Sequence, residues 1–323
     1  MKNVLIDGTN LAHVHFAANP ALDDNGNPIG IVKGFMNAVV RINRAYLPDN
    51  IIVFFDGKGG SQQRRELYKG YKEGRKPRTS VGQHYQFSSP EEAARNYDWQ
   101  VDHLRDFLTC CGVGIIETEF YETDDGIAYF VSKNRESENI IVSCDKDFYQ
   151  LLDENTKIYN PIAKSEVDCE YVLGKFGIHP ANWLFYRSIT GDPSDNIDGV
   201  KGFGPKTVQK MFQVDKIKSI PLSVIDDAIQ VLAEEKLTAK EKTIQKRLFK
   251  LKENKDKLDR NWKLMDLRDP LLSQHSKESL DFQLGNFRSS LDTKTFYAKV
   301  SNLNIPLNPM VTREFVRLTN VQL

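Results

Sequence analysis

The sequence predicts an α/β protein, in which a central, mainly parallel sheet with flanking helices is followed by a largely helical C-terminal region. Three observations lead to this fold class. Short apolar runs rich in Val and Ile recur through the first half of the 323-residue chain, helical patterns separate these runs, and beyond about residue 167 the pattern is almost all helical. Strands that alternate with helices form parallel sheets with helices on both faces.

The apolar runs predict four strands, at residues 4–6, 51–55, 113–116 and 140–142. Between them, helical periodicity predicts helices over about residues 31–46, 98–111 and 124–133. Residues 79–95 are polar and lack a strong period, which predicts a mobile loop or a loosely helical segment. The change of pattern follows Asn160 and Pro161, and we expect two domains, residues 1–165 and residues 166–323.

The charge of the chain is balanced in total but segregated along the sequence. The 44 Lys and Arg residues match the 44 Asp and Glu residues, yet residues 58–78 carry a net charge of +6 and residues 236–263 one of +7. The remaining chain is therefore acidic, with a net charge of −13. Each basic segment by itself also fits an ordinary solvated helix.

Cysteine and hydropathy patterns indicate a cytoplasmic protein. The four cysteines show no metal-ligand spacing, which predicts reduced thiols. No apolar run approaches the roughly 20 residues of a membrane span, and we expect no membrane partner.

Acidic residues follow each of the four predicted strands. They are Asp7, Asp56, the group Glu122, Asp124 and Asp125, and the pair Asp145 and Asp147. The carboxyl ends of parallel strands lie along one edge of a sheet, so these side chains would converge there. Carboxylates at close range repel one another and need counter-ions, and oxygen-rich sites suit Mg²⁺ or Mn²⁺. The set predicts a metal site, although any one Asp also fits a helix cap or a turn.

The segment GDPSDNIDGVKGFGPKTV, residues 191–208, combines acidic and glycine-rich parts. Asp192 and Asp195 would bring further metal ligands to the same edge, whereas Asp198 fits a turn or hairpin residue. The second part has the glycine spacing of a helix–hairpin–helix, in which free backbone N–H groups bind a DNA phosphate without reading sequence. The residues expected to contact nucleic acid there are Lys201, Gly202, Gly204 and Lys206. A plain helix–turn–helix packing element is the alternative.

Taken in order, the motifs LIDGTN, VFFDG, YKxxR, YETDD, SCDKDFYQL and GDPSDNIDGVKGFGPKT resemble the flap endonuclease or 5′ nuclease family over roughly residues 1–215. The resemblance implies a PIN-like 5′ nuclease core with a helical arch over about residues 58–97 and a helix–hairpin–helix over about residues 180–215. It also implies two or more Mg²⁺ ions, replaceable by Mn²⁺, and K⁺ at the hairpin. The matching metal ligands are Asp7, Asp56, Glu122, Asp124, Asp125, Asp145, Asp147, Asp192 and Asp195.

Basic residues recur at close to helical spacing within the arch segment, with two tyrosines among them. We expect Arg64, Arg65, Tyr68 and Tyr71 to bind single-stranded nucleic acid, because cations follow a phosphate backbone and rings stack on bases. The resemblance implies a further role for the residues that match YKxxR. Lys72 and Arg75 would contact the phosphate that is cut, and Lys69 is a competitor for that role.

The resemblance implies a structure-specific 5′ nuclease, with exonuclease, flap endonuclease and primer-removing ribonuclease H activity in DNA replication and repair. Within the family, the size and the helical C-terminal region are most similar to the ribonuclease H branch of T-even phages. This similarity implies that the protein acts in the cytoplasm of a phage-infected bacterial cell. Implied partners are branched or flapped duplex DNA, RNA/DNA hybrid and replication proteins such as a single-strand-binding protein or sliding clamp; a monomer is expected. Two alternatives are a non-catalytic protein that binds DNA junctions and an aspartyl-phosphate phosphatase.

Overall fold

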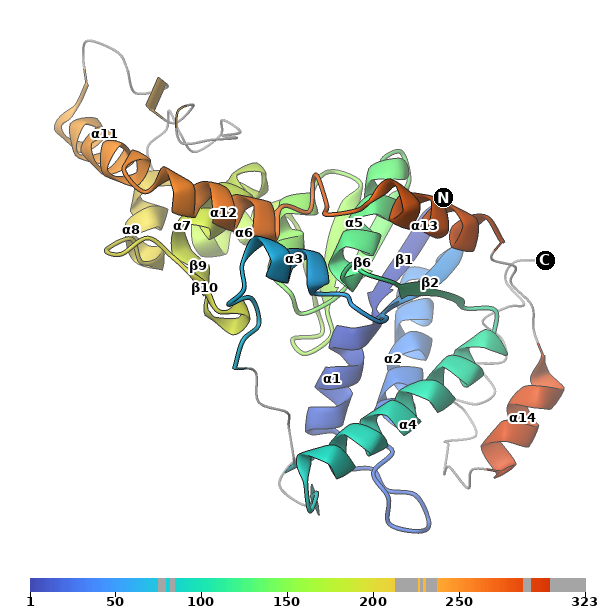
Figure 1. Ribbon diagram of the computed structural model, residues 1–323. Coiled ribbons are helices and arrows are strands. Elements are labelled where there is room, and N and C mark those ends of the chain that lie inside the picture. The colour runs from blue at the N-terminus through green and yellow to red at the C-terminus, as the bar shows by residue number, and fades with distance from the viewer. Residues whose placement is uncertain are drawn as a thin grey trace.

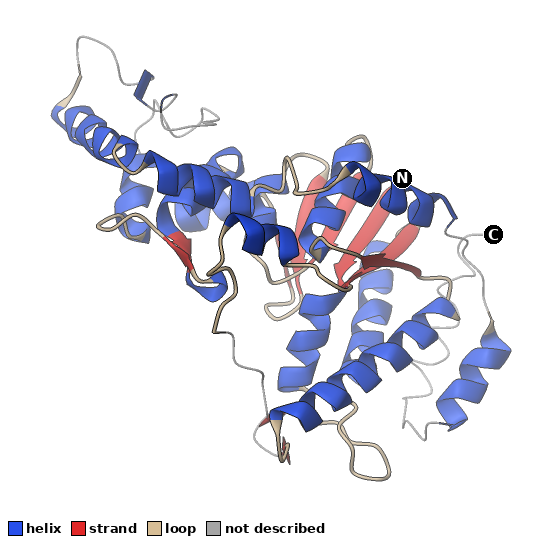
Figure 2. Ribbon diagram, viewed as in Figure 1, coloured by secondary structure: helices blue, strands red, loops and turns tan. Residues whose placement is uncertain are grey.

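The structure is a computed structural model that describes residues 1–74, 80–81, 85–212, 226, 229–230, 237–286 and 292–302. A central sheet lies between two groups of helices, and further helices extend from one side of this core (Figures 1 and 2). None of the described helices is both long and apolar enough to cross a bilayer. All four cysteines are free thiols, as the sequence predicts.

The central sheet has six strands in the order β5-β2-β1-β6-β7-β8. The strands are β1 (Lys2–Asp7), β2 (Asn50–Asp56), β5 (Gly114–Thr118), β6 (Glu138–Val142), β7 (Thr156–Asn160) and β8 (Ser165–Val167). All neighbours pair in parallel except β7 and β8. The four predicted strands are therefore confirmed, and the sequence analysis missed β7 and β8, which are more polar.

Side chains of the central strands alternate between two apolar cores, one on each face of the sheet. Leu5, Ile52 and Phe54 pack in one core, whereas Ile6 and Val53 pack in the other. This period of two is what strands buried on both faces require. The first core also takes in α5 (Thr123–Lys133), and the second takes in α1 (Gly8–Ala18), α2 (Gly30–Tyr46) and α4 (Pro90–Thr109).

Helix α4 begins at Pro90, eight residues before the predicted start at residue 98. Ser89 caps it, because the Ser89 side chain accepts a hydrogen bond from the backbone N–H of Glu92, and Pro90 suits the first helical position. Before the cap, the short strands β3 (Ser80–Val81) and β4 (Tyr85–Gln86) pair antiparallel. The prediction of a loop or loose helix over residues 79–95 is thus wrong for the described part of that segment.

The chain becomes helical where the sequence indicates, since β8 ends at Val167 and α6 (Cys169–Phe176) follows. Then come α7 (Trp183–Thr190), the short paired strands β9 (Gly191–Asp192) and β10 (Ile197–Asp198), and α8 (Pro205–Phe212). The C-terminal helices described are α11 (Ala239–Lys252), α12 (Lys255–Met265), α13 (Gln274–Asn286) and α14 (Thr293–Asn302). One apolar core joins the sheet to α7, α8 and α11, and the division into two domains stays a prediction.

Helix α12 ties the helical region to the core. The Asn261 side chain donates hydrogen bonds to the backbone oxygens of Ser188 (2.9 Å) and Asp198 (2.8 Å). At the end of α12, the Met265 backbone oxygen accepts a hydrogen bond from the Gln150 side chain, and the Leu267 N–H donates to that side chain, both at 2.9 Å. Helix α12, at the end of the basic segment, therefore fixes the position of the β9–β10 hairpin relative to the sheet.

Three asparagines fix the register of the sheet at the end opposite the acidic residues. Asn3 stands level with Asn50 on one side and with Asn139 on the other. Their amides join across the strands, from Asn50 to Asn3 at 3.0 Å and from Asn3 to Asn139 at 3.1 Å. A slip of one residue would bury these amides without partners, so the row holds the strand ends level.

Replacing Asn139 with Ala should lower the free energy of unfolding by about 1–3 kcal/mol, because the buried Asn3 amide loses its acceptor. Thermal and urea unfolding would measure the change. Asn286→Ala is the matched control, since Asn286 is exposed and, among the described residues, its side chain donates to the Phe282 oxygen of its own helix. Equal effects of the two substitutions would contradict a role for the asparagine row.

Candidate active site

The C-terminal ends of β1 and β2 and the segment after β6 bring carboxylates to one edge of the sheet, as the sequence predicts. Asp7 ends β1 and caps α1, accepting hydrogen bonds from the Asn10 N–H (3.0 Å) and from Ser143 Oγ (2.9 Å). Asp56 ends β2 and accepts from the Thr123 N–H and hydroxyl at 2.8 and 2.7 Å. These contacts orient each carboxylate without neutralising it.

Burial and mutual repulsion raise the pKa values of several of these carboxyls. Burial, with added repulsion from Asp56 and Asp145, raises the pKa of Asp7 to about 7. Burial and repulsion from Asp145 and Asp7 raise the pKa of Asp124 well above its ordinary value. These shifts show that the Asp7, Asp124 and Asp145 side chains are near enough to oppose each other's ionisation.

The second part of the cluster is formed by Asp145 and Asp147 with residues from the β9–β10 region. Burial raises the pKa of Asp145, and the Asp195 and Asp192 charges add to it although the Asp147 N–H and Arg187 oppose it. Burial likewise raises the pKa of Asp147 to about 7, with repulsion from Asp145 and against the pull of Arg187. The chain thus brings the predicted acidic residues of both halves together.

The donor set fits divalent cations of the hard type. It consists of carboxylate oxygens of buried and half-buried residues that lie close together and that resist ionisation in the absence of added positive charge. Within the described residues, however, no three acidic, His or Cys side chains form a ready-made ligand group. Ion binding would therefore have to draw these carboxylates away from the protein cations that several of them contact.

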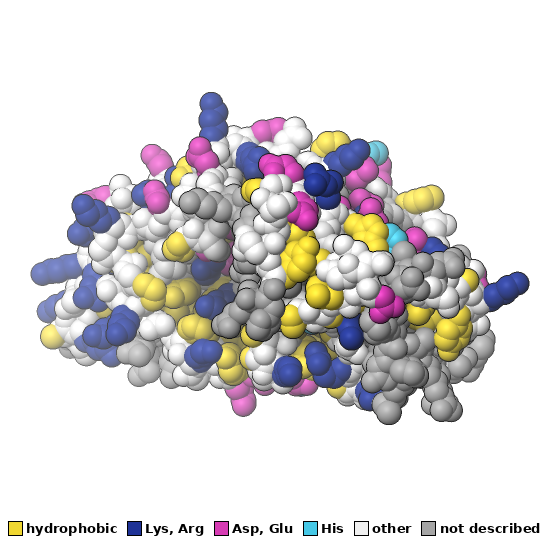
Figure 3. All heavy atoms as spheres, turned by 90° about the horizontal axis from the view of Figure 1, so that it is seen from below, with side chains coloured by type: hydrophobic (Ala, Val, Ile, Leu, Met, Phe, Trp, Pro, Cys, Tyr) yellow, Lys and Arg dark blue, Asp and Glu magenta, His cyan; other side chains and the backbone are white. Residues whose placement is uncertain are grey.

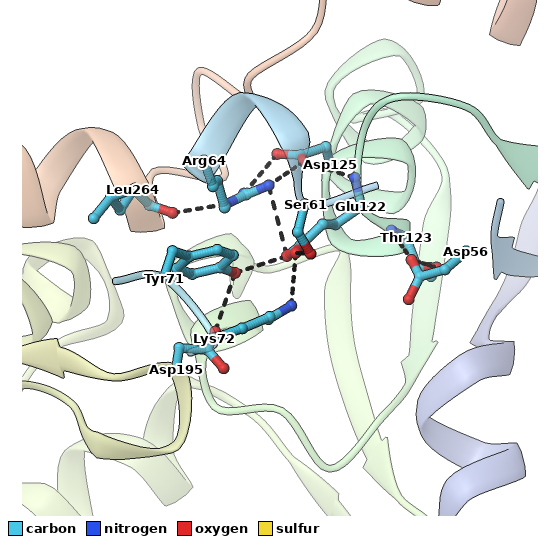
Figure 4. Close-up of polar contacts among 10 residues, drawn as sticks. All are labelled: Asp56, Ser61, Arg64, Tyr71, Lys72, Glu122, Thr123, Asp125, Asp195 and Leu264. Carbon is cyan, nitrogen blue, oxygen red and sulfur yellow. Dashed lines mark hydrogen bonds and ion pairs between the residues drawn. The ribbon is translucent and has the colours of Figure 1, made fainter. Parts of the chain in front are cut away.

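Arg64 is the first of these cations, and its position differs from the predicted contact with nucleic acid. Its side chain is only 4% exposed. Its two terminal nitrogens bind both oxygens of Asp125, at 2.5 and 2.9 Å, and its Nε donates to the backbone oxygen of Leu264 at 2.9 Å (Figure 4). The helical spacing that suggested a surface position instead turns Arg64 inward from α3 (Gln62–Leu67).

This pairing also affects the prediction for Asp125. Both carboxylate oxygens of Asp125 accept hydrogen bonds from Arg64, and one also accepts from the Glu122 N–H at 3.2 Å. A bidentate, fully buried pair of this kind leaves no oxygen directed at an ion. Asp125 therefore acts as an anchor for the start of the arch segment in this structure.

Tyr71 and Lys72 turn back onto the acidic edge. The buried Tyr71 hydroxyl lies 2.9 Å from Glu122 Oε2 and 3.1 Å from Asp195 Oδ2, which differs from the predicted stacking on bases (Figure 4). Lys72 Nζ lies 2.6 Å from Glu122 Oε1. Although burial opposes ionisation of Glu122, Arg64 and Lys72 hold its pKa at about 2, so Glu122 carries a charge that the protein itself neutralises.

The remaining predicted arch residues stay at the surface or lie outside the described residues. Arg65 and Lys69 are exposed and line an open pocket of about 720 Å³ beside Gly59, Gly60 and Ser61. The half-buried Tyr68 ring packs against the Arg260 guanidinium of α12, 4.3 Å from its centroid. Arg75 lies outside the described residues.

The hairpin predicted from the glycine spacing is present. Lys201, Gly202 and Gly204 in the loop before α8 are exposed, and so is Lys206 in the first turn of α8. Gly202 has a φ of 90°, which favours glycine, and neither Gly202 nor Gly204 has a heavy atom within 4 Å of where a Cβ would stand. The backbone is therefore open to a ligand at this point. Asp198 lies in β10, in agreement with its prediction as a hairpin residue.

Arg187 is the site residue that the sequence analysis missed. Its Nε donates to Asp147 Oδ1 at 2.7 Å, and another nitrogen binds Asp192 Oδ2. Burial opposes the charged form of Asp192, but Arg187 and Ser194 outweigh it and lower the Asp192 pKa. A signal was available, since Arg187 precedes Asp192 by little more than one helical turn at the end of an apolar helix.

Basic side chains also gather at one end of the molecule. The view from below shows Lys and Arg side chains concentrated toward the end that carries α8 and α11, away from the sheet (Figure 3). Lys242, Lys246 and Lys250 of α11 are exposed, opposite the buried side of that helix. The positive charge of residues 236–263 is thus at the surface in its described part.

Together, the mainly parallel sheet, the flanking helices and the acidic edge define a PIN-like nuclease fold. Residues 2–177 match the family described as "5'-3' exonuclease, N-terminal resolvase-like domain". Because this match covers more than half of the chain, the protein belongs to the 5′-3′ exonuclease family, which is a family of nucleases.

Two relatives and one solved structure illustrate the similarity. The chain is 32% identical over 239 residues to DNA polymerase I of Caldicellulosiruptor bescii, covering 68% of this chain and 26% of the polymerase. It is 29% identical over 206 residues to a 5'-3' exonuclease of Aquifex aeolicus, covering 63% of this chain and 66% of that protein. The chain thus spans about a quarter of the polymerase and two thirds of the exonuclease.

The solved structure is the bacteriophage T5 D15 flap endonuclease in a complex with DNA and metal ions. The two folds superpose with a TM-score of 0.63 at 18% identity, over 99% of this chain and 100% of that one. The similarity therefore extends into the helical C-terminal region and supports the predicted fold class for the described part of the chain.

The metal-free protein should become less stable as the pH rises from 6 to 8. In the folded state Asp7 and Asp147 have pKa values near 7, whereas the ordinary value is 3.8, so the folded state binds more protons in this range. The free energy of unfolding then falls with pH, by about 1 kcal/mol per carboxyl. Thermal unfolding in EDTA at both pH values measures this, and Asp7→Asn should reduce the slope. An unchanged or higher midpoint at pH 8 would contradict it.

Arg64 and its neighbour Arg65 provide a matched pair of substitutions on one short helix. Arg64→Ala should lower the free energy of unfolding by about 3–5 kcal/mol, because it leaves Asp125 buried and unpaired. Arg65→Ala, at an exposed position, should change it by less than about 0.5 kcal/mol. Chemical denaturation would measure both. A stable Arg64→Ala protein that has lost only affinity for nucleic acid would restore the predicted surface role.

Proposed function

We propose that this protein is a divalent-metal-dependent 5′ nuclease that hydrolyses phosphodiester bonds at the 5′ ends and junctions of duplex nucleic acid. The observation that carries the proposal is the edge where the buried Asp7 and the half-buried Asp124, Asp145 and Asp147 lie near enough to oppose each other's ionisation. A structural role alone gives no reason to bury several like charges together. Family membership supports the same reaction class.

The residues that would hold the ions are the carboxylates at this edge that Arg64 does not saturate. They are Asp7, Asp56, Glu122, Asp124, Asp145, Asp147, Asp192 and Asp195. When bound, divalent ions would supply the positive charge that favours ionisation of water and stabilises a phosphate being cut. Mg²⁺ is the proposed ion, and Mn²⁺, with similar oxygen ligands, would replace it.

The chain's own cations and amides would place the substrate. The open backbone around Gly202 and Gly204 would bind the phosphate backbone of the duplex, with Lys201 and Lys206 beside it. Lys72 already lies at the acidic edge, and a phosphate there would compete with Glu122 for its ammonium group. Arg65 and Lys69 are exposed in the first part of the arch segment, and they would contact the phosphates of single-stranded nucleic acid.

The T5 flap endonuclease structure supports the choice of substrate. That protein is described as a flap endonuclease in complex with DNA and metal ions, and its fold matches this chain almost throughout. We extend this to a 5′ flap on duplex DNA and to a 5′ RNA strand paired with DNA as the substrates of this protein.

Removal of two carboxylates tests the proposal. Asp145→Asn/Asp147→Asn should reduce cleavage of a 5′-labelled flap in Mg²⁺ by about 100-fold or more, because both lie in the proposed ion site. Binding of the same flap in Ca²⁺, measured by gel shift, should persist. The double substitution Asp153→Asn/Glu154→Gln removes the same charge from exposed positions and should leave cleavage unchanged.

Wild-type cleavage should also stop with EDTA and should favour the flap over a blunt duplex of the same sequence. A wild-type protein that binds the junction tightly yet cuts nothing in Mg²⁺ or Mn²⁺ would refute the nuclease. It would leave a protein that only binds DNA junctions.

A further inference from the structure

Arg187 connects two parts of the chain that reach the acidic edge from different directions. Asp147 follows β6 of the central sheet, whereas Asp192 lies in β9 of the helical region. Arg187, on α7, binds one oxygen of each, with Nε at 2.7 Å from Asp147 Oδ1 and a terminal nitrogen on Asp192 Oδ2. Its third nitrogen donates to the Gly191 backbone oxygen at 3.3 Å.

The two carboxylates differ in what else they bind. The other oxygen of Asp192 accepts hydrogen bonds from the Ser194 N–H (2.9 Å) and hydroxyl (2.6 Å). The described residues provide no corresponding hydrogen bond to Asp147 Oδ2. Arg187 therefore binds one oxygen of Asp192, whose other oxygen accepts hydrogen bonds from Ser194. It also binds one oxygen of Asp147, whose other oxygen has no such hydrogen bond among the described residues.

The buried arginine on the other side of the site makes a different kind of contact. Arg64 encloses both oxygens of Asp125, bonds to the backbone of Leu264, and lies 3.7 Å from Glu122 Oε2. Arg187 instead makes a single-point contact with each of two carboxylates, and its side chain is 13% exposed against 4% for Arg64. Its bonds to the acidic residues can therefore be exchanged one at a time.

We propose that Arg187 is a resident counter-cation, a positioning residue that balances the charge of Asp147 and Asp192 in the metal-free protein and opposes ion binding to them. The inference rests on the proposed function, because it concerns the same ion site. Asp147 and Asp192 bring two carboxylates together, and Arg187 supplies one positive charge between them. An ion that binds these oxygens must either displace Arg187 or lie beside it, and both weaken the binding.

With this arrangement, ion binding to Asp147 and Asp192 would be weak in the free protein and favoured in the complex with substrate. A phosphate brings negative charge of its own, which offsets Arg187 and favours the ion. In the free protein the arginine keeps the two parts of the site in register without an ion.

Arg187→Met tests the proposal, since Met retains much of the volume and removes the charge. In EDTA its unfolding midpoint should lie well below that of the wild type, because Asp147 and Asp192 lose their counter-ion. Saturating Ca²⁺ or Mg²⁺ should raise its midpoint at least twice as much as that of the wild type. Mn²⁺ alone, titrated by calorimetry, should bind about tenfold more tightly, since one opposing charge is gone.

Arg268→Met is the matched control. Arg268 is an exposed arginine that donates to the Ala181 backbone oxygen, and its contacts among the described residues do not reach the acidic edge. Its loss should lower the midpoint equally with and without ions. The conservative variant Arg187→Lys keeps a charge that contacts one carboxylate at a time, so its ion-induced rise should fall between wild type and Arg187→Met.

Equal losses of midpoint in EDTA and in saturating ions for Arg187→Met would overturn the proposal, as would weaker Mn²⁺ binding. If that variant does not fold, Arg187→Lys decides: an ion-induced rise no larger than that of the wild type overturns the proposal, and a larger rise supports it. Failure of the proposed function itself has a separate signature, because then the wild type would neither bind Mn²⁺ nor gain stability from it.

Discussion

The close approach of like-charged carboxylates at one edge of the sheet is the constraint on which the rest of this structure depends. Parallel strands held in register bring Asp7 and Asp56 to that edge, and α5 and the segment after β6 add Asp124 and Asp145. Such a cluster raises the free energy of the folded chain unless positive charge accompanies it. Arg64, Lys72 and Arg187 supply that charge from three separate elements.

These cations also determine how the two halves of the molecule join. Arg64 extends from α3 to Asp125 on α5 and to the Leu264 oxygen at the end of α12. Asn261, one turn earlier on α12, binds the backbone oxygens of Ser188 on α7 and of Asp198 in the β9–β10 hairpin. The arch segment, the acidic edge and the hairpin are therefore linked through one C-terminal helix. The helices beyond residue 177, where the family match ends, are therefore packed onto the matched part of the chain through these contacts.

The sequence was sufficient for the fold class, four of the six sheet strands and the convergence of the acidic residues. Val- and Ile-rich runs mark buried parallel strands directly, and the acidic residues that follow these runs are expected at the edge where the strands end. Strands β7 and β8 were not predicted, because Thr156–Asn160 and Ser165–Val167 are short and mixed in polarity. The roles of Arg64 and Tyr71 were not readable, since spacing along a helix does not say which face a tertiary contact will bury.

The same limit explains why Arg187 was missed and why charge totals mislead. A basic residue is assigned to the surface by default, yet a buried acidic cluster requires buried cations, so the presence of one predicts the other. In this chain Arg64 and Arg187 are used internally, whereas Lys201, Lys206 and the lysines of α11 remain exposed. A net charge of zero is therefore compatible with a surface that attracts nucleic acid, because the acidic residues that balance the total are partly buried beside arginines.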